Sequence, residues 1–286
     1  GDNSGAGGNQ GGEGGEQGGN QGGEGDGGQT GPKETEFVIL FTNDFHSQIE
    51  PLSKEETYNA DRGGIKRIKV LVDSVRMAEK TVFLADAGDY VQGTYYFSLL
   101  NGAVEMKVMD QLGYDVRTLG NHEFDFGVDT LAEVLKIAQF PVVCSNYDVT
   151  GTVLEGVVLP YTIITRGELR IGVFGLGVDP KGLIAEKNFA PIQYLEPIPT
   201  AQQMADKLKS CEKCDIVICL SHLGTHPGAH GQLSDMDVAA QTANIDVIIG
   251  AHTHKIVENL FVANLKGDSV LLTQTGKAGA RIGEIS

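Results

Sequence analysis

The chain has 286 residues, a formal net charge of −16 at pH 7 and 41% hydrophobic residues. The apolar fraction is ordinary for a globular protein, and no stretch approaches the roughly 18 apolar residues of a membrane-spanning helix. The acidic excess disfavours binding to nucleic acid, whose phosphates are also negative. We therefore expect a globular protein that does not bind nucleic acid.

Residues 1–34 differ in composition from the rest of the chain. Up to Gly31 they are mostly Gly with Asn, Gln, Glu and Asp, and Ala6 is their only apolar residue. Such a segment buries almost nothing to offset the entropy cost of ordering it. We predict a disordered, acidic, Gly-rich tether over 1–34 and a folded domain over 35–286.

A polar tether ahead of a folded domain is typical of exported lipoproteins. The chain begins with Gly rather than Met, so we expect that a signal segment and a lipidated Cys precede it. This hypothesis predicts a periplasmic or cell-surface lipoprotein that touches the membrane only through a lipid anchor upstream of the tether.

Short apolar runs alternate with amphipathic stretches from residue 37 to residue 144. The runs predict buried strands, and apolar residues three or four positions apart predict helices. In chain order we expect a strand at 37–41, a helix at 64–80, a strand at 82–85, a helix at 95–112 broken near Asn101-Gly102, a strand at 116–119, a helix at 128–138 and a strand at 141–144.

The pattern changes after residue 151. Two runs, 160–165 and 169–177, flank Arg166-Gly167-Glu168 and predict a β-hairpin. We then expect a loop over 179–199, a helix at 200–209, a strand at 216–220, a helix at 234–242, a strand at 246–249 and further β-hairpins between 256 and 285. Together these elements predict an α/β domain with mixed sheets whose outer faces are covered by helices.

The four cysteines fall into two groups. Cys144 and Cys219 lie in apolar runs, so we predict buried thiols. Cys211 and Cys214 form a lone C-x-x-C without a second Cys or His pair nearby, which is weak evidence for zinc. A redox role or a local disulfide is the alternative for this pair.

Polar side chains follow five of the predicted strands at the point where each strand ends. Five of the seven histidines lie in these loops. Because ligands of open α/β sheets bind beyond the carboxyl ends of strands, we expect the loops to form one site. The five segments are Asn43-Asp44-Phe45-His46, Asp86-Ala87-Gly88-Asp89, Gly120-Asn121-His122, Ser221-His222 and Gly250-Ala251-His252-Thr253-His254.

The residue types in these loops indicate metal binding. Asp, Asn and His without Cys suit two divalent ions of intermediate hardness, such as zinc, manganese, iron or cobalt. A D-x-H or H-x-H spacing projects both side chains to one side, and an Asp between two such groups can bridge two ions. Two ions roughly 3.5–4 Å apart stabilise the attacking and leaving oxygens of phosphoryl transfer.

The same motifs, in this order, resemble the metallophosphoesterase domain of the 5′-nucleotidase family. That family includes UDP-sugar hydrolases and 2′,3′-cyclic-nucleotide phosphodiesterases, and the resemblance covers nearly the whole chain from Glu36 to Ile285. It implies a four-layer α-β-β-α sandwich with two mixed β-sheets. The matching segments are Thr42–His46, Asp86–Thr94, Gly120–Gly127, Ser221–Gly224 and Gly250–His254.

The resemblance also implies the metal ligands. One ion would be held by Asp44, His46, Asp89 and His254. The other would be held by Asp89, Asn121, His222 and His252, so that Asp89 bridges the two. Family members usually carry Gln or Asn where this chain has His254.

By the same resemblance, a hydroxide bound to the metal ions would attack phosphorus. His122 would stabilise the transition state and protonate the leaving group, while Asp125 would orient His122. Asn121, His122 and His222 would contact the substrate phosphate. We expect Glu123 to support the loop rather than bind metal, and His226 and His230 to be solvent-exposed loop residues.

The familiar nucleotidases carry a second, C-terminal domain that recognises the nucleotide. This chain ends at Ser286, where the first domain should finish. We therefore expect a dinuclear metal-dependent phosphoesterase, 5′-nucleotidase-like, that hydrolyses nucleotide-type phosphate esters. The alternatives are a catalytic half that acts with a separate specificity domain on cyclic nucleotides or nucleotide sugars, or a non-catalytic surface-tethered binding module.

Overall fold

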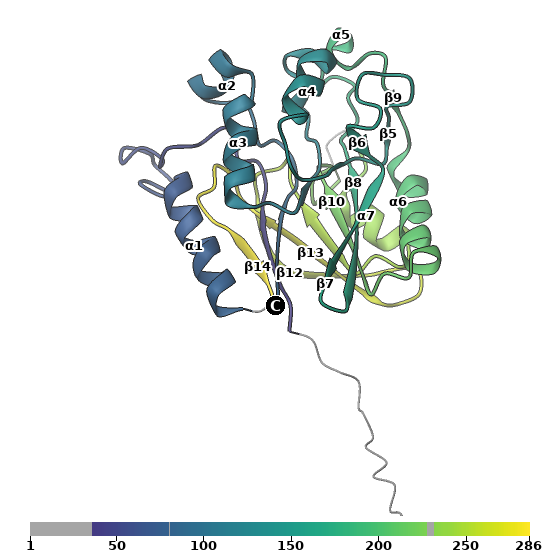
Figure 1. Ribbon diagram of the computed structural model, residues 1–286. Helices are drawn as coiled ribbons and strands as arrows, with labels where there is room; N and C mark the ends of the chain where they lie inside the picture. Colours follow the sequence, from purple (N-terminus) through teal and green to yellow (C-terminus); the bar gives the residue numbers. More distant parts are fainter. Residues whose placement is uncertain (1–35, 80, 228–231) are drawn as a thin grey trace, which may run out of the picture. The chain divides into compact units, whose positions relative to one another are not determined.

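Strands and helices alternate along the first half of the chain, as the sequence predicts (Figure 1). The computed structural model describes residues 36–79, 81–227 and 232–286, so the predicted tether over 1–34 and His230 lie outside the described residues. The elements are β1 (Val38–Thr42), α1 (Ile65–Ala78), β2 (Val82–Asp86), α2 (Tyr95–Leu100), α3 (Ala103–Leu112), β3 (Val116–Arg117), the 3-10 turn η1 (His122–Phe124), α4 (Gly127–Leu135), β4 (Val142–Val143), β5 (Tyr147–Asp148) and β6 (Val158–Leu159). The predicted break between α2 and α3 is confirmed at Asn101 and Gly102, which have φ of 54° and 97°.

The second half contains the two predicted hairpins, β7–β8 and β12–β13. Its elements are β7 (Tyr161–Arg166), β8 (Leu169–Leu176), α5 (Glu186–Phe189), β9 (Gln193–Tyr194), α6 (Pro197–Asp206), the π-helical turn η2 (Lys207–Cys211), β10 (Ile216–Ser221), α7 (Asp235–Gln241), β11 (Val247–Gly250), β12 (Ile256–Ala263), β13 (Ser269–Thr275) and β14 (Gly283–Ile285). The prediction of a plain loop over 179–199 is wrong in part, because α5 and β9 lie within it.

Two six-stranded sheets carry the fold. The first has the order β14-β1-β2-β3-β4-β6, and the second has the order β12-β13-β11-β10-β8-β7. In the first sheet every pairing is parallel except that of β14 with β1. In the second sheet the edge strands β12 and β7 are antiparallel to their neighbours and the inner pairings are parallel. Both sheets are therefore mixed, as predicted.

The position of β14 corrects the prediction of hairpins throughout 256–285. Instead of pairing with β13, β14 joins the first sheet beside β1. The chain turns away from β13 through Gly276, Ala278 and Gly279, whose φ values of 81°, 59° and 59° end the extended conformation. The Ala278 N–H then donates to the Asp44 carbonyl at 2.8 Å. The crossing segment therefore lies directly against the loop after β1.

Alternate side chains of the central strands enter different cores. In β1, Val38 and Leu40 pack with residues of α1, α3 and α4. Ile39 and Phe41 instead belong to the core between the two sheets. Strand β10 alternates in the same way between that core and the core under α6 and α7. The order of layers is helices, sheet, sheet, helices, which confirms the predicted four-layer sandwich.

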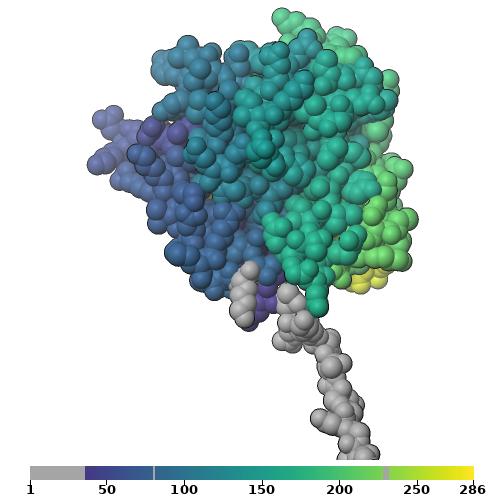
Figure 2. Space-filling view, in the orientation of Figure 1, coloured from purple at the N-terminus to yellow at the C-terminus, as the bar shows by residue number. Residues whose placement is uncertain are grey.

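The surface seen in Figure 2 is formed by both halves of the chain. Atoms of the first half, in purple to teal, pack against those of the second half, in green, without a visible break on this face.

None of the helices in the described residues is long and apolar enough to cross a membrane.

The four cysteines are free thiols. Cys144 and Cys219 are buried as predicted, Cys214 is buried as well, and Cys211 is exposed. Burial raises the pKa of the Cys144 thiol to about 12. Among the described residues, no disulfide joins Cys211 to Cys214, and neither belongs to a group of potential metal ligands.

We expect a single fast-reacting thiol in the native protein. Thiolates, not thiols, react with disulfide reagents, and burial both blocks access and disfavours ionisation. Titration with Ellman's reagent at pH 8 should modify Cys211 quickly, and Cys211→Ser should remove this phase. Four thiols should react in urea. Fast loss of two thiols in the native protein would contradict the buried environment of Cys214.

Candidate metal centre

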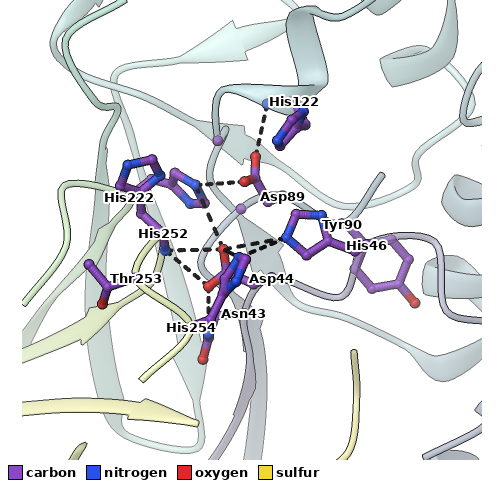
Figure 3. A network of polar contacts seen from close by, with 12 residues as sticks. Asn43, Asp44, His46, Asp89, Tyr90, His122, His222, His252, Thr253 and His254 are labelled. Carbon is purple, nitrogen blue, oxygen red and sulfur yellow. Dashed lines mark hydrogen bonds and ion pairs between the residues drawn. The ribbon is translucent and has the colours of Figure 1, made fainter. Parts of the chain in front are cut away.

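Five loops at the carboxyl ends of parallel strands meet in one cluster (Figure 3). The loops after β1, β2 and β3 come from the first sheet, and those after β10 and β11 come from the second. The convergence predicted from the strand-end motifs is therefore present. The side chains that these loops carry are Asp44, His46, Asp89, Asn121, His122, His222, His252 and His254.

The first group of potential ligands is Asp44, His46 and His254. The two imidazole Nε2 atoms lie 2.9 Å apart. Asp44 Oδ1 lies 3.4 Å from His254 Nε2 and 4.0 Å from His46 Nε2. An ion with bonds of about 2.0–2.2 Å holds neighbouring ligand atoms about 3–4 Å apart. The spacing therefore fits one ion among these three side chains.

The second group is Asp89, His222 and His252. His222 Nε2 lies 3.0 Å from Asp89 Oδ2 and 3.9 Å from Asp44 Oδ1. Asn121 lies in the loop after β3, and its Oδ1 is buried without a hydrogen-bond partner among the described residues. Asp44 thus lies within 4 Å of histidines from both groups, while the bridging role predicted for Asp89 stays a prediction.

Two buried carboxylates dominate the electrostatics of the cluster. Asp44 and Asp89 have exposed fractions of 0% and 1%. Burial lowers the pKa of His222, but the carboxylates of Asp89 and Asp44 outweigh burial and raise it to about 10. Burial and the neighbouring His222 lower the pKa of His252 to about 4, so that imidazole is neutral at pH 7. Buried carboxylates require positive charge, which the His222 imidazolium supplies in part. Carboxylates, imidazoles and an unpartnered amide oxygen are a donor set that fits divalent metal ions, and a bound ion would displace the second proton of His222.

The ligand loops have unusual backbone conformations. Five of the seven predicted ligands have positive φ: Asp44 (48°), His46 (52°), Asp89 (54°), His252 (71°) and His254 (55°). Non-Gly residues adopt this region rarely, and when they do they cluster at functional sites. At His252 this conformation lets the N–H donate to both Asp44 oxygens, at 3.1 and 2.9 Å. Backbone geometry and ligand placement are therefore coupled.

One motif glycine, Gly88, allows the loops after β2, β3 and β10 to approach closely. A Cβ at Gly88 would lie 2.7 Å from the Gly120 nitrogen and 2.8 Å from His222 Nδ1. His222 Nδ1 lies 2.9 Å from the Ala87 carbonyl, which is an acceptor only, so this nitrogen carries the proton and Nε2 faces Asp89. The Gly88 position therefore helps to select the imidazole nitrogen that faces the cluster.

His122 and Asp125 form a separate pair beside the cluster. His122 Nδ1 lies 3.0 Å from Asp125 Oδ2. This contact with Asp125 raises the pKa of His122. The two side chains are 32% and 36% exposed, far more than the buried carboxylates. Outside the cluster, His226 is exposed, as predicted.

Three buried side chains that the sequence prediction missed hold the ligand loops. Asn43 Nδ2 donates to Asp44 Oδ2 at 2.7 Å and to the Gly276 carbonyl at 2.8 Å. Gln274 Oε1 accepts from Thr253 Oγ1 at 2.8 Å. Asp235 accepts from the hydroxyl of Ser221, beside His222. Asn43 lies next to a predicted ligand, but Gln274 and Asp235 are distant in sequence from the loops that they hold, so no local signal marks them.

Fold and site together define a metallophosphoesterase domain. Residues 37–256 match the calcineurin-like phosphoesterase family model. The chain is 34% identical over 227 residues to human 5′-nucleotidase, covering 77% of this chain and 38% of that protein. It is 26% identical to the trifunctional nucleotide phosphoesterase protein YfkN of Bacillus subtilis, covering 87% of this chain and 18% of that protein.

Among solved structures, a 5′-nucleotidase precursor from Thermus thermophilus superposes with a TM-score of 0.77 at 30% identity. That match covers 87% of this chain and 51% of that chain. The chain belongs to the calcineurin-like phosphoesterase family, and it spans well under half the length of the animal 5′-nucleotidases that it matches.

A pH-dependent effect is expected at Asp235. Burial raises the pKa of its carboxyl from 3.8 to about 7. The native state therefore keeps a proton that the unfolded chain loses, so stability falls as pH rises between these values and the full penalty applies above pH 7. Asp235→Asn retains an acceptor for Ser221 and cannot ionise. Relative to wild type, its free energy of unfolding should increase by about 2 kcal/mol from pH 5 to pH 7.

Urea unfolding of EDTA-treated protein at each pH measures this difference. The internal control is the interval from pH 8 to pH 9, where no further change between the two proteins is expected. A difference that stays constant from pH 5 to pH 7 would show that Asp235 ionises normally in the native state.

Proposed function

We propose that this chain is the catalytic domain of a metal-dependent phosphoesterase that hydrolyses nucleotide-type phosphate esters. The observation that carries the proposal is the convergence of two ligand groups, each with its ligand atoms within 4.8 Å of one another, from four loops of two sheets. Family membership and the 5′-nucleotidase relatives support the reaction class.

For the metal ions, we assign two sites that share Asp89. The first comprises Asp44, His46, Asp89 and His254, and the second comprises Asp89, Asn121, His222 and His252. The interatomic distances of 2.9–4.0 Å support the first site, and the 3.0 Å contact of Asp89 with His222 supports the second. Zinc, manganese, iron and cobalt all suit this donor set.

Two bound divalent ions would act as Lewis acids toward the phosphoryl group and supply a nucleophile at neutral pH. The buried carboxylates Asp44 and Asp89 would hold the site rigid and exclude water from its base. Asn121, His122 and His222 would contact the phosphate oxygens. The resulting charge stabilisation is the largest contribution that such a site makes to rate.

His122 is assigned the proton-transfer role. Asp125 accepts from Nδ1 and raises the pKa of the imidazole, which favours its protonated form. Nε2 of the same ring is then the atom that would donate to the leaving-group oxygen. Asp125 would orient the ring and stabilise its charged form.

For the substrate, the proposal names a class of esters rather than one compound. The chain covers 38% of human 5′-nucleotidase and 18% of YfkN. Contacts made by the remaining parts of such relatives would improve binding of a particular ester without belonging to the reaction centre. This favours a second candidate function, in which the domain acts with a separate specificity domain on nucleotides, cyclic nucleotides or nucleotide sugars.

For localisation, we propose export and attachment through a lipid upstream of residue 1. The composition of residues 1–34 supports this proposal. When cells that express the full gene are grown with radiolabelled palmitate, the label should be attached to this protein. A gene that lacks a signal segment ending in Cys would contradict this proposal.

Metal content and turnover test the function together. Wild-type protein loaded with Mn²⁺ or Zn²⁺ should bind two ions per chain by elemental analysis and should hydrolyse an aryl phosphate and AMP. Asp89→Asn should lose both ions and activity. His122→Ala should keep the ions and lose about 10²–10⁴-fold in kcat, the usual contribution of a general acid.

His226→Ala is the matched control, because it removes an exposed imidazole outside the cluster. Its rate should equal that of wild type. Full metal loading with no hydrolysis of any ester tested would favour the binding-module alternative. Equal rates in wild type and His122→Ala would reveal a contaminating phosphatase.

A further inference from the structure

A single carboxylate outside the predicted ligand set joins two of the ligand loops. Glu123 is 5% exposed and accepts three main-chain hydrogen bonds. Oε2 accepts from Asp89 N at 3.1 Å and from Gly120 N at 2.8 Å, and Oε1 accepts from Tyr90 N at 3.0 Å. Glu123 belongs to neither ligand group. Its carboxylate therefore connects the loop after β2 to the loop after β3.

The charge of this carboxylate is balanced by a buried guanidinium. Arg117, at the end of β3, has no exposed surface and pairs with Glu123 through Nη2. The guanidinium also contacts the sulfurs of Met106 and Met109 at 3.6 and 3.8 Å, and its Nε donates to the Thr118 carbonyl at 3.1 Å and lies 4.0 Å from Asp86 Oδ1. The pair is thus fully buried, where an unpaired charge would be costly.

The two loops that Glu123 joins are in very close contact. A Cβ at Gly120 would lie 2.2 Å from Asp89 Oδ1, and the His122 N–H donates to the same oxygen at 2.9 Å. The Asp89 carboxylate therefore fits into the backbone of residues 120–122 (Figure 3). Small movements of either loop would change where Asp89 lies relative to Asn121 and His222.

We propose that Glu123 is a positioning residue: with Arg117 as its counter-ion, it sets the separation of the Asp89 and Asn121 loops and thereby the affinity of the site for its second ion. The proposal rests on the proposed function, since it concerns the same metal site. The loop separation is set by protein groups alone. A Gln at 123 offers one acceptor oxygen for three N–H donors, so the separation should relax.

A purely structural role makes a different prediction. If the Arg117–Glu123 pair only stabilised the fold, its loss would lower the free energy of unfolding and leave the metal affinity of the folded protein unchanged. A second ion pair offers a control: Asp115 accepts from the Leu84 N–H at 2.8 Å and pairs with Arg166, and the two side chains are 16% and 33% exposed. Asp115→Asn therefore removes an ion pair and a main-chain contact outside the ligand loops, in a less buried setting than Glu123.

The experiment is calorimetric titration of EDTA-stripped protein with Mn²⁺. In Glu123→Gln, one of the two sites should weaken by about 10- to 100-fold, the usual effect of altering a residue that supports metal ligands. Asp115→Asn should stay within about twofold of wild type, although both variants are expected to unfold at lower urea. Wild-type affinity at both sites in folded Glu123→Gln would overturn the proposal.

Hydrogen exchange keeps the test decisive if Glu123→Gln does not fold. In stripped wild-type protein, the amides of Asp89, Tyr90 and Gly120 should be protected, and zinc should change their protection little. Fast exchange of these amides that slows only with zinc would mean that the ion sets the loops. If wild-type protein binds no ions, the proposed function is contradicted. If these amides nevertheless stay protected, the result still supports the proposal that Glu123 sets the loop separation.

Discussion

The burial of two carboxylates is the constraint on which the rest of the site depends. Asp44 and Asp89 are removed from water, and a buried charge is tolerated only where hydrogen bonds and opposite charges replace the lost hydration. Asp44 receives two contacts from the His252 N–H and one from Asn43 Nδ2. Asp89 receives the His122 N–H. The candidate metal ligands and the main-chain donors thus both stabilise the two buried carboxylates.

That constraint explains the strained loops. An N–H can point into a strand-end loop only if the local backbone leaves the extended conformation. At His252 the required turn has a φ of 71°. Each such residue costs about 1–3 kcal/mol and persists only where the surroundings determine it. Here the surroundings are two sheets that end at the same cluster, together with glycines such as Gly88 that let the loops touch.

The layered scaffold and the residues of the two candidate ligand groups could be predicted from the sequence because their signals are local. Continuous apolar runs indicated β1 and β10, and polar residues directly after those runs indicated the ligands. The two-residue strands β5, β6 and β9 were not predicted, although the equally short β3 and β4 were. The crossing of β14 to the first sheet depends on a turn at 276–279 and on contact with β1, which no local pattern encodes.

The residues of the site that were not predicted are those whose role depends on contacts formed only in the folded protein. Arg117 looks like one polar residue interrupting an apolar strand, and such a residue would ordinarily disfavour a buried strand. Its burial is tolerated because Glu123 lies against it, and Glu123 in turn is held by donors from two loops. A local conflict between sequence and environment is typical of a functional site, where the compensation comes from elsewhere in the fold.

Exposure is graded across the site, from buried carboxylates to partly exposed histidines. Asp44, Asp89 and His222 are essentially buried, the His46 side chain is 14% exposed, and His122 and His254 are about one-third exposed. Among the described residues of the cluster, the accessible side is therefore that of His122 and His254. In the proposed function, a phosphate would enter from this side and lie toward the buried carboxylates.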